Sequence, residues 1–370
     1  MKFGKGNPLA TNKSFVNTKC PKCNGNARRE TDTIDTFFDS SWYYLRYCDS
    51  KNPDMPFDRV KTEYWMPVDQ YIGGAEHACM HLIYARFFTK ALRDMGFVNF
   101  DEPFIKLFNQ GLLQMGGFVM SKSRGNVILP DTISDRYGID AGRLFLLSVS
   151  SPDKDMEWSD EGIENSYKIL TRFYSLIKTN RGDGKKDSFI ISKRESLIKS
   201  VTHDIDNFRF NIAIKDIIEL INYVHKYRNQ ISSSVYKETL EKLSLLLSPF
   251  TPHLCEESWS KLGHKSFISL EKWPDADERK IDKKVLELED IFKKTLEDLN
   301  QVLKLAKGTK AYLYFVTEKE LEYFKDNLDF VKQQFDFKEI VPSLSRNPNK
   351  YDPQNKSTKA KFGKPGIYLE

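Results

Sequence analysis

A short apolar run, a glycine pair and a long amphipathic segment follow one another between Asp69 and Gly96. Residues 69–74 read DQYIGG, which is typical of a strand that enters a glycine turn. Residues 75–96 have a helical period, and Gly96 would end that helix. One face of the helix would hold His77, His81, Tyr84, Phe88 and Leu92. Residues 104–111, FIKLFNQG, predict a second, buried strand, so the order favours an α/β layer with parallel strands.

The pattern changes from mixed to helical near Ile163. From there to Leu262 nearly every segment has a helical period, and short loops separate the segments, which indicates a helical bundle. The predicted helices cover residues 164–180, 193–208, 211–229 and 236–263. Beyond them we expect another helix, a strand at 310–316, a helix at 318–335 and a polar basic tail. Between Arg346 and Lys364 this tail has one acidic residue, Asp352.

The composition is that of an ordinary folded chain of two or three domains. Of its 370 residues, 40% are hydrophobic and 29% are charged. There is no run of roughly 18 apolar residues, and MKFGKGNPLA lacks the apolar stretch of a signal peptide. We therefore expect a cytoplasmic protein with no membrane partner. A net charge of +5 mildly favours a polyanionic partner.

Residues 116–130, GGFVMSKSRGNVILP, form a polar run directly after a predicted turn. Its hydroxyls and backbone N–H groups could donate hydrogen bonds to phosphates, and Lys122 would supply a point charge. A lone Ser-Lys-Ser is more often a solvated turn, so the surrounding motifs have to decide between the two interpretations.

Three stretches in a fixed order supply that context: DTFFDSSWYYLRY at 35–47, PVDQYIGGAEHACMHLIYARFFTKAL at 67–92 and VMSKSRGN at 119–126. Together they closely resemble the second half of the catalytic domain of bacterial-type leucyl-tRNA synthetases, which are class I enzymes. SPFTPHLCEESW at 248–259 is similar to a stretch of the anticodon-domain bundle of that family. The resemblance covers roughly Pro8 to Trp273, and the closing KPGIYLE resembles archaeal relatives.

The resemblance implies an α/β fold built from four parts. They are a post-editing linker with a zinc half-knuckle (1–30), the second half of a class I Rossmann-like catalytic domain with the MSKS loop (31–150), an α-helical anticodon-binding-type bundle (151–275), and a small C-terminal α/β domain with a basic tail that binds tRNA (276–370). Because leucine enzymes generally do not read the anticodon, we expect the bundle to bind tRNA by shape and phosphate contacts.

The family activates its amino acid with ATP and Mg²⁺, and the resemblance assigns the ATP site. Lys122 is the catalytic residue at the phosphates, and Val119 stands where the family has its first loop lysine. Glu76 would accept hydrogen bonds from the ribose. The alternative is a favourable charge at a helix N-terminus, and both can hold at once. The remaining ATP-binding candidates are Gly73, Gly74, Gln110, Gly111, Met120, Ser121 and Ser123.

The same resemblance places a leucine pocket beside the glycine turn. Its candidate residues are Ser41, Tyr44, Tyr71, His77 and His81, whereas Trp42, Tyr43 and Tyr47 are expected in the core. His77 and His81 could formally bind a metal, but aromatic neighbours argue against it, and a core histidine is the alternative for His81. An apolar pocket separates amino acids by only ~1–3 kcal/mol per methylene, which explains why the family carries an editing domain.

The CPKC stretch has the spacing of half a zinc site, with Cys20 and Cys23 as ligands. Tetrahedral Zn²⁺ needs four ligands, and Cys48, Cys79 and Cys255 fall in segments assigned elsewhere. Either another chain supplies the remaining ligands, or the pair is a solvated turn that binds no zinc.

No segment resembles an editing domain or the family's HIGH loop, and none of the six histidines has that arrangement. We therefore expect the C-terminal half of a split leucyl-tRNA synthetase, or a truncated form of one. It would charge tRNA(Leu) with leucine as a heterodimer with the N-terminal half, and be inactive alone. The alternatives are a valine, isoleucine or methionine enzyme, and a non-catalytic tRNA-binding module.

Overall fold

The computed structural model describes residues 6–178, 180–305 and 308–370. Eight residues therefore lie outside the described residues: five at the start of the predicted linker, one in the predicted bundle and two in the C-terminal part. The chain divides into two compact units. The first contains residues up to Leu112 together with Asp153–Asp155, and the second contains Leu113–Pro152 and Met156–Glu370.

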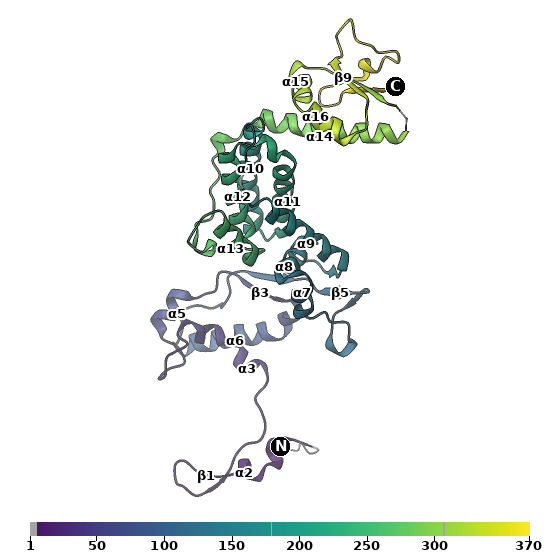
Figure 1. Cartoon of the computed structure of the whole chain (residues 1–370). Helices are drawn as coiled ribbons and strands as arrows, with labels where there is room; N and C mark the ends of the chain where they lie inside the picture. The colour runs from purple at the N-terminus through teal and green to yellow at the C-terminus, as the bar shows by residue number, and fades with distance from the viewer. Residues whose placement is uncertain (1–5, 179, 306–307) are drawn as a thin grey trace. The chain divides into compact units, whose positions relative to one another are not determined.

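The first unit combines short helices with two small sheets (Figure 1). Its elements are α1 (Pro8–Thr11), α2 (Lys13–Val16), β1 (Asn17–Lys19), β2 (Asn26–Arg28), α3 (Phe37–Ser40), α4 (Tyr43–Cys48), α5 (Arg59–Trp65), β3 (Tyr71–Gly74), the 3-10 helix η1 (Ala75–Cys79), α6 (His81–Asp94) and β4 (Leu107–Gln110). β1 and β2 form an antiparallel hairpin. β3 and β4 are parallel, with Tyr71 opposite Leu107, which confirms the predicted α/β order.

The segment after the glycine pair is not one helix, as the periodicity predicted. Residues 75–79 form η1, and Met80, with φ −125° and ψ −104°, interrupts the helical backbone before α6 begins at His81. His77 and His81 therefore lie on two different elements. Their rings nevertheless meet edge to face, with centroids 6.1 Å apart.

The second predicted strand is exposed rather than buried. Within the described residues β3 and β4 pair only with each other, so both of the sheet's outer edges lack a neighbouring strand. Leu107 is 47% exposed, and Ile72 on β3 is 55% exposed. The core of this unit lies instead around α4, α6 and residues such as Leu45, Ala85 and Leu92. An apolar strand exposed on this scale indicates a surface that needs a cover.

The second unit begins with a three-stranded sheet that carries the MSKS segment. Its first elements are β5 (Leu113–Met115), β6 (Phe118–Val119), the 3-10 helix η2 (Lys122–Arg124), α7 (Pro130–Tyr137), α8 (Ile139–Ser148) and β7 (Met156–Glu157). The strand order is β6-β5-β7, where β6 is antiparallel and β7 parallel to β5.

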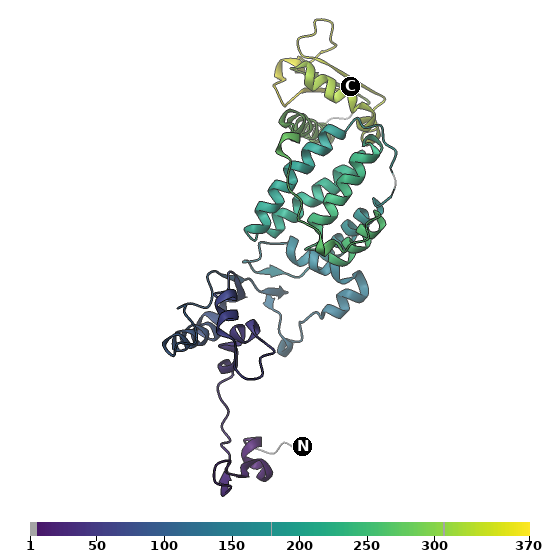
Figure 2. The same ribbon diagram turned by 90° about the vertical axis from the view of Figure 1, so that its left-hand side faces the viewer.

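A helical bundle follows, as predicted. It comprises α9 (Asp160–Ser175), α10 (Asp187–Asp206), α11 (Phe210–Tyr227), η3 (Arg228–Gln230), α12 (Ser233–Leu247), α13 (Pro252–Lys261), η4 (Ile268–Leu270) and η5 (Glu278–Lys280). Figures 1 and 2 show α10, α11 and α12 running side by side around a common core. The predicted helix at 236–263 is divided, because α12 ends before Pro249 and α13 starts at Pro252. Among the described residues, no helix is both long and apolar enough to span a bilayer.

The C-terminal part is a small α/β domain. It contains α14 (Lys283–Leu305), β8 (Lys310–Phe315), α15 (Glu318–Asp326), α16 (Leu328–Gln334), β9 (Glu339–Leu344), η6 (Lys356–Lys359) and β10 (Gly366–Leu369). The strand order is β10-β8-β9, so the end of the chain returns to pair with β8 beyond the basic tail. The helix predicted at 318–335 is two helices, because Asn327 separates α15 from α16.

Candidate functional site

A cavity of about 230 Å³ lies at the β3 glycine turn of the first unit. Tyr71 and the glycine pair enter it from β3, His77 from η1, and His81 from the start of α6. Ile72, Leu82 and Leu107 complete its lining. The cavity thus brings together five residues that the sequence predicted for the leucine and adenosine sites: Tyr71, Gly73, Gly74, His77 and His81.

A short hydrogen-bond chain joins two polar groups of this cavity, those of Tyr71 and His81, to Tyr43. The Tyr71 hydroxyl lies 2.7 Å from the Tyr43 hydroxyl and 2.8 Å from Nε2 of His81. Burial, with a smaller contribution from His77, lowers the pKa of His81, and burial raises the pKa of Tyr71. Both of these shifts favour the uncharged forms of His81 and Tyr71. Nδ1 of His77 and Nδ1 of His81 are buried and have no partner among the described residues, so they could bond to a ligand.

Two predicted pocket residues, Ser41 and Tyr44, do not line this cavity. Tyr44 is 5% exposed and lies in the core, where its hydroxyl donates to the Ala85 carbonyl at 3.1 Å and contacts Thr89 Oγ1 at 2.9 Å. Ser41 is buried and donates to the carbonyl of Phe38. Tyr43, which was expected in the core, takes the place beside Tyr71, whereas Tyr47 is 75% exposed. Both Tyr43 and Tyr44 belong to α4, a helix of only six residues.

The glycines of the predicted ATP site have different local roles. A Cβ atom at Gly74 would overlap the Glu76 carboxylate, so that side chain lies directly over the turn, whereas Gly73 faces open space. A Cβ atom at Gly111 would overlap the backbone of Lys154. Gly111 is therefore explained by close backbone packing. Gln110 ends β4 with an exposed side chain.

The MSKS loop is held at its base and exposed at its tip. The Asn126 side chain accepts from Ser121 N at 2.9 Å and donates to the Val119 carbonyl at 3.3 Å, so it closes the loop. Met120 N donates to the Leu113 carbonyl at 3.0 Å. Lys122 is exposed, and its ammonium has no hydrogen bond or ion pair within the described parts of the chain, while Ser121 Oγ lies 3.2 Å from Ser123 Oγ.

The CPKC segment forms the turn between β1 and β2. Backbone N–H groups of Cys23 and Lys22 point to the Cys20 sulfur and lower its pKa, which favours the thiolate that a metal requires. Cys20 and Cys23 are free thiols. Across residues 6–178, 180–305 and 308–370, no three His, Cys, Asp or Glu side chains gather around a metal position. The turn fits a zinc ion chemically, but it provides only half of a tetrahedral set.

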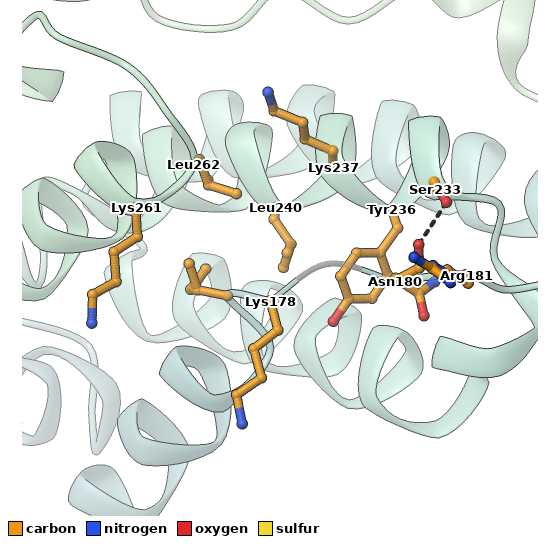
Figure 3. A pocket seen from close by; sticks show the side chains of 10 residues that line it. Lys178, Asn180, Arg181, Ser233, Tyr236, Lys237, Leu240, Lys261 and Leu262 are labelled. Carbon is orange, nitrogen blue, oxygen red and sulfur yellow. Dashed lines mark hydrogen bonds between the residues drawn. The ribbon is translucent and has the colours of Figure 1, made fainter.

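A second cavity, of about 460 Å³, lies in the bundle between the ends of α9, α12 and α13. Figure 3 shows Leu240, Leu262 and the Tyr236 ring in its centre. Four cationic side chains surround them: Lys178, Arg181, Lys237 and Lys261. Lys237 pairs with Glu241 at 3.8 Å and Lys261 with Glu257 at 3.3 Å. The other two cations have no ion pair among the described residues.

Two family models match the chain in the order of its domains. The model for class I tRNA synthetases of the isoleucine, leucine, methionine and valine group matches residues 5–159. The model for the anticodon-binding domain of tRNA ligases matches residues 187–315, from α10 to β8. The first match includes both the glycine-turn cavity and the MSKS loop, and the second includes most of the bundle.

Similar proteins narrow the group to leucine. The chain is 44% identical over 302 residues to a leucine–tRNA ligase of Thermotoga maritima, covering 77% of this chain and 36% of that protein. It is 46% identical over 287 residues to the Thermosipho melanesiensis ligase, covering 73% and 35%. The chain thus spans about a third of the length of these curated relatives.

One solved structure agrees with this grouping, and a second shares the fold. The LeuRS of Agrobacterium radiobacter K84 agnB2, solved in a ternary complex with tRNA and LeuAMS, matches 92% of this chain and 45% of its own length, with 30% identity and a TM-score of 0.69. A Mycobacterium tuberculosis methionyl-tRNA synthetase bound to methionyl-adenylate matches 67% and 52%, with 19% identity and a TM-score of 0.50, which indicates a shared fold only. The chain therefore belongs to the leucyl-tRNA synthetase family of class I enzymes.

Proposed function

We propose that this chain supplies the second half of the active site, and the tRNA-binding bundle, of an enzyme that joins leucine to tRNA(Leu) through a leucyl-adenylate. One observation carries the proposal. The cavity at the glycine turn gathers Tyr71, His77 and His81 next to Gly73 and Gly74. These are the positions that the family resemblance assigns to leucine and adenosine, and relatives sharing 44–46% identity are leucine–tRNA ligases.

In the adenylation step, the leucine carboxylate attacks the α-phosphate of ATP and pyrophosphate leaves. Negative charge grows on the transferring and departing oxygens, so positioned cations and N–H donors provide most of the catalysis. Lys122 is free to serve as such a cation because no carboxylate among the described residues pairs with it. Ser121 and Ser123 lie beside it as hydroxyl donors, with Met120 at the base of the loop. Val119 contributes no charge.

The nucleotide half of the site draws on the glycine turn. Gly73 leaves open space for a nucleoside, and the Glu76 carboxylate over Gly74 can accept from ribose hydroxyls. Gln110 is a candidate for the adenine end. ATP reaches enzymes of this kind with Mg²⁺. The phosphates of ATP bind this ion directly, as is usual for Mg²⁺ at nucleotide sites.

Leucine would occupy the uncharged part of the cavity. A neutral His81, fixed by Tyr71, presents little electrostatic attraction for a charged side chain, and Leu82 and Leu107 add apolar surface. Such a pocket favours a branched apolar side chain over a smaller one by only ~1–3 kcal/mol per methylene. Discrimination beyond that limit would require editing elsewhere in the enzyme.

The partner we propose is the first half of the same catalytic domain, with the HIGH loop and the editing domain. β3 has an unpaired edge, and apolar side chains such as Ile72, Ile105 and Leu107 are exposed. A neighbouring strand and its helices would cover both the edge and the apolar face. Without them the ATP site lacks its other phosphate-binding loop, so this chain alone would be inactive.

The half-knuckle is proposed as a zinc site that the partner completes. Cys20 and Cys23 would provide two thiolates, and two further ligands would come from the N-terminal half. When bound, zinc would stabilise the linker hairpin and would take no part in the reaction. If the partner supplies no such ligands, the segment is a solvated turn.

Binding of tRNA is proposed for the bundle and the C-terminal domain. The cations around the bundle cavity and the six Lys or Arg residues between Arg346 and Lys364 would contact phosphates, so affinity should fall steeply with salt.

The four parts would keep the boundaries expected from the sequence: a linker (1–30), half of the catalytic domain (31–150), the bundle (151–275) and a C-terminal tRNA-binding domain (276–370). The enzyme would act in the cytoplasm.

The test is leucine-dependent exchange of pyrophosphate into ATP. The chain would be assayed alone and after mixing with the separately expressed N-terminal part of the Thermotoga maritima relative. We expect exchange only in the mixture, and with leucine far above isoleucine, valine or methionine. Methionine-dependent exchange would instead support the rival enzyme class. Binding of tRNA with no exchange under any pairing would support the non-catalytic module.

A further inference from the structure

The hairpin that carries the MSKS loop has a turn that is bonded by a distant carboxylate. Gly116 and Gly117 form the two-residue turn between β5 and β6, with φ of 64° and 75°. Glycine is favoured in such a turn because both central residues have positive φ. Gly117 N lies 3.3 Å from Oε1 and 3.4 Å from Oε2 of Glu157, and Gly116 N also donates to Oε1. One side chain therefore receives both N–H groups of the turn.

Glu157 reaches the turn from β7, which precedes the bundle directly. It stands opposite Gln114 in the parallel pairing of β7 with β5, and Trp158 N donates to the Gln114 carbonyl at 2.8 Å. The Trp158 ring packs edge to face on Phe145 of α8, which is 1% exposed. Ser159 then caps α9. Glu157 thus links the hairpin to a segment anchored on α8 and continuous with the first bundle helix.

The position of Lys122 depends on this hairpin. β6 is only two residues long and pairs with β5 alone within the described residues. Its end leads directly into the loop, where the Asn126 bonds transmit the position of Val119 to Ser121. A tilt of the hairpin would therefore move η2 and Lys122 as one piece.

The Glu157 bonds contribute more to placement than to global stability. The turn glycines are exposed, so water could replace the carboxylate at their N–H groups at little cost. The core of the unit, around α8 to α13, does not contain these residues. Loss of the carboxylate should therefore release the hairpin without unfolding the chain.

We propose that Glu157 is a positioning residue that holds the MSKS loop, and Lys122 with it, in a fixed orientation relative to α8 and the start of the bundle. Its part in catalysis rests on the proposed adenylation function. Its effect on the loop does not, because every contact involved lies within the second unit of this chain.

The experiment compares Glu157→Ala and Glu157→Gln with Glu161→Ala, which removes an exposed carboxylate from the first turn of α9. Trypsin cleaves after Lys122 and Arg124, so mass spectrometry of the full-length chain measures how often the loop opens. We expect Glu157→Ala to raise the cleavage rate at these two sites at least about threefold, with an unchanged thermal midpoint. Glu157→Gln should restore much of the protection, because its amide oxygen still accepts.

The exchange assay with the N-terminal half provides the second readout. Glu157→Ala should lower kcat and leave the KM for leucine nearly constant, because leucine binds in the other unit. Equal cleavage rates in Glu157→Ala and Glu161→Ala would overturn the proposal, and so would a lowered thermal midpoint that Glu157→Gln fails to correct. If no variant or parent shows exchange, the proposed function fails while the proteolysis comparison still decides the role of Glu157.

Discussion

Lys122 is the residue on which the proposed chemistry can be tested most directly. Its ammonium is exposed on η2 and has no partner among the described residues, so its removal leaves no buried charge and should not affect folding. If it stabilises charge that develops at the phosphates, it acts more strongly on the transition state than on bound ATP.

We expect Lys122→Ala in the assembled enzyme to slow leucyl-adenylate formation by about 10²–10³, with a much smaller change in ATP affinity. Single-turnover formation of the adenylate measures the first quantity, and equilibrium binding of ATP the second. Lys154→Ala, at another exposed lysine, serves as the control. A normal adenylation rate in Lys122→Ala would show that the MSKS segment is a solvated turn with no part in the chemistry.

The residues around the cavity show which parts of a site a single sequence can predict and which it cannot. Motif order predicted that Tyr71, His77 and His81 converge, and the 230 Å³ cavity brings them together. The predicted positions of Tyr43 in the core and Tyr44 in the pocket were interchanged. The reason is that α4 has only six residues and each step along a helix turns the side chain by about 100°. In so short a helix no periodicity indicates which tyrosine faces the core.

Among the elements, the long helices were predictable and the short strands were not. α9 to α12 each bury a broad apolar face, and their helical period is clear in the sequence. β5, β6 and β7 are two or three residues long, too short to show an alternating pattern. The breaks at Met80 and Asn327 also escaped prediction, because neither residue is a proline or glycine.

A buried charge cluster joins the bundle to the C-terminal domain. Glu289 of α14 is 1% exposed and accepts from the Tyr227 hydroxyl at 2.6 Å and from the Tyr323 hydroxyl at 2.5 Å. Lys186 Nζ lies 3.3 Å from it and Lys226 Nζ 3.7 Å. These contacts connect α14 with α11, with α15 and with the residue that precedes α10.

The cluster predicts a pH dependence of stability. Burial lowers the pKa of Lys226 to about 8, below the usual lysine value. Between pH 8 and about 10 the unfolded chain therefore binds a proton that the folded chain has released, and stability attributable to Lys226 should rise with pH. Above about pH 10 the raised pKa values of Tyr227 and Tyr323 reverse the trend, since the unfolded tyrosines ionise first.

Lys226→Met keeps the length of the side chain and removes its titration. Between pH 8 and pH 10, we expect the free energy of unfolding of the parent to rise by about 2 kcal/mol relative to that of the variant. Urea titrations at intervals across this range measure the difference. Lys215→Met changes an exposed position on α11, and its free energy of unfolding should vary with pH as that of the parent does. A constant difference between parent and Lys226→Met would mean that Lys226 stays protonated in the folded chain.

At the scale of the whole molecule, the exposed face of the first unit predicts assembly. Ile72, Ile105 and Leu107 are 55%, 61% and 47% exposed on or beside a two-stranded sheet with unpaired outer edges. Exposed apolar strands of this kind are rare in isolated folded units. The apolar pattern at 104–111 predicted a buried strand, and a cover from the first half of the domain would make that prediction correct in the assembled enzyme.

We expect the chain to form a 1:1 complex with the N-terminal half of a relative, with more than ~2,000 Å² buried, as is typical of permanent interfaces. Light scattering after size-exclusion chromatography measures the mass of the complex. Leu107→Glu should prevent assembly, because it places a charge against the covering strand. Leu270→Glu changes a leucine that is 78% exposed in the bundle, far from the sheet in sequence, and should assemble normally. A chain that stays monomeric with every tested N-terminal half, or a Leu107→Glu variant that assembles as well as Leu270→Glu, would show that this face is not the interface.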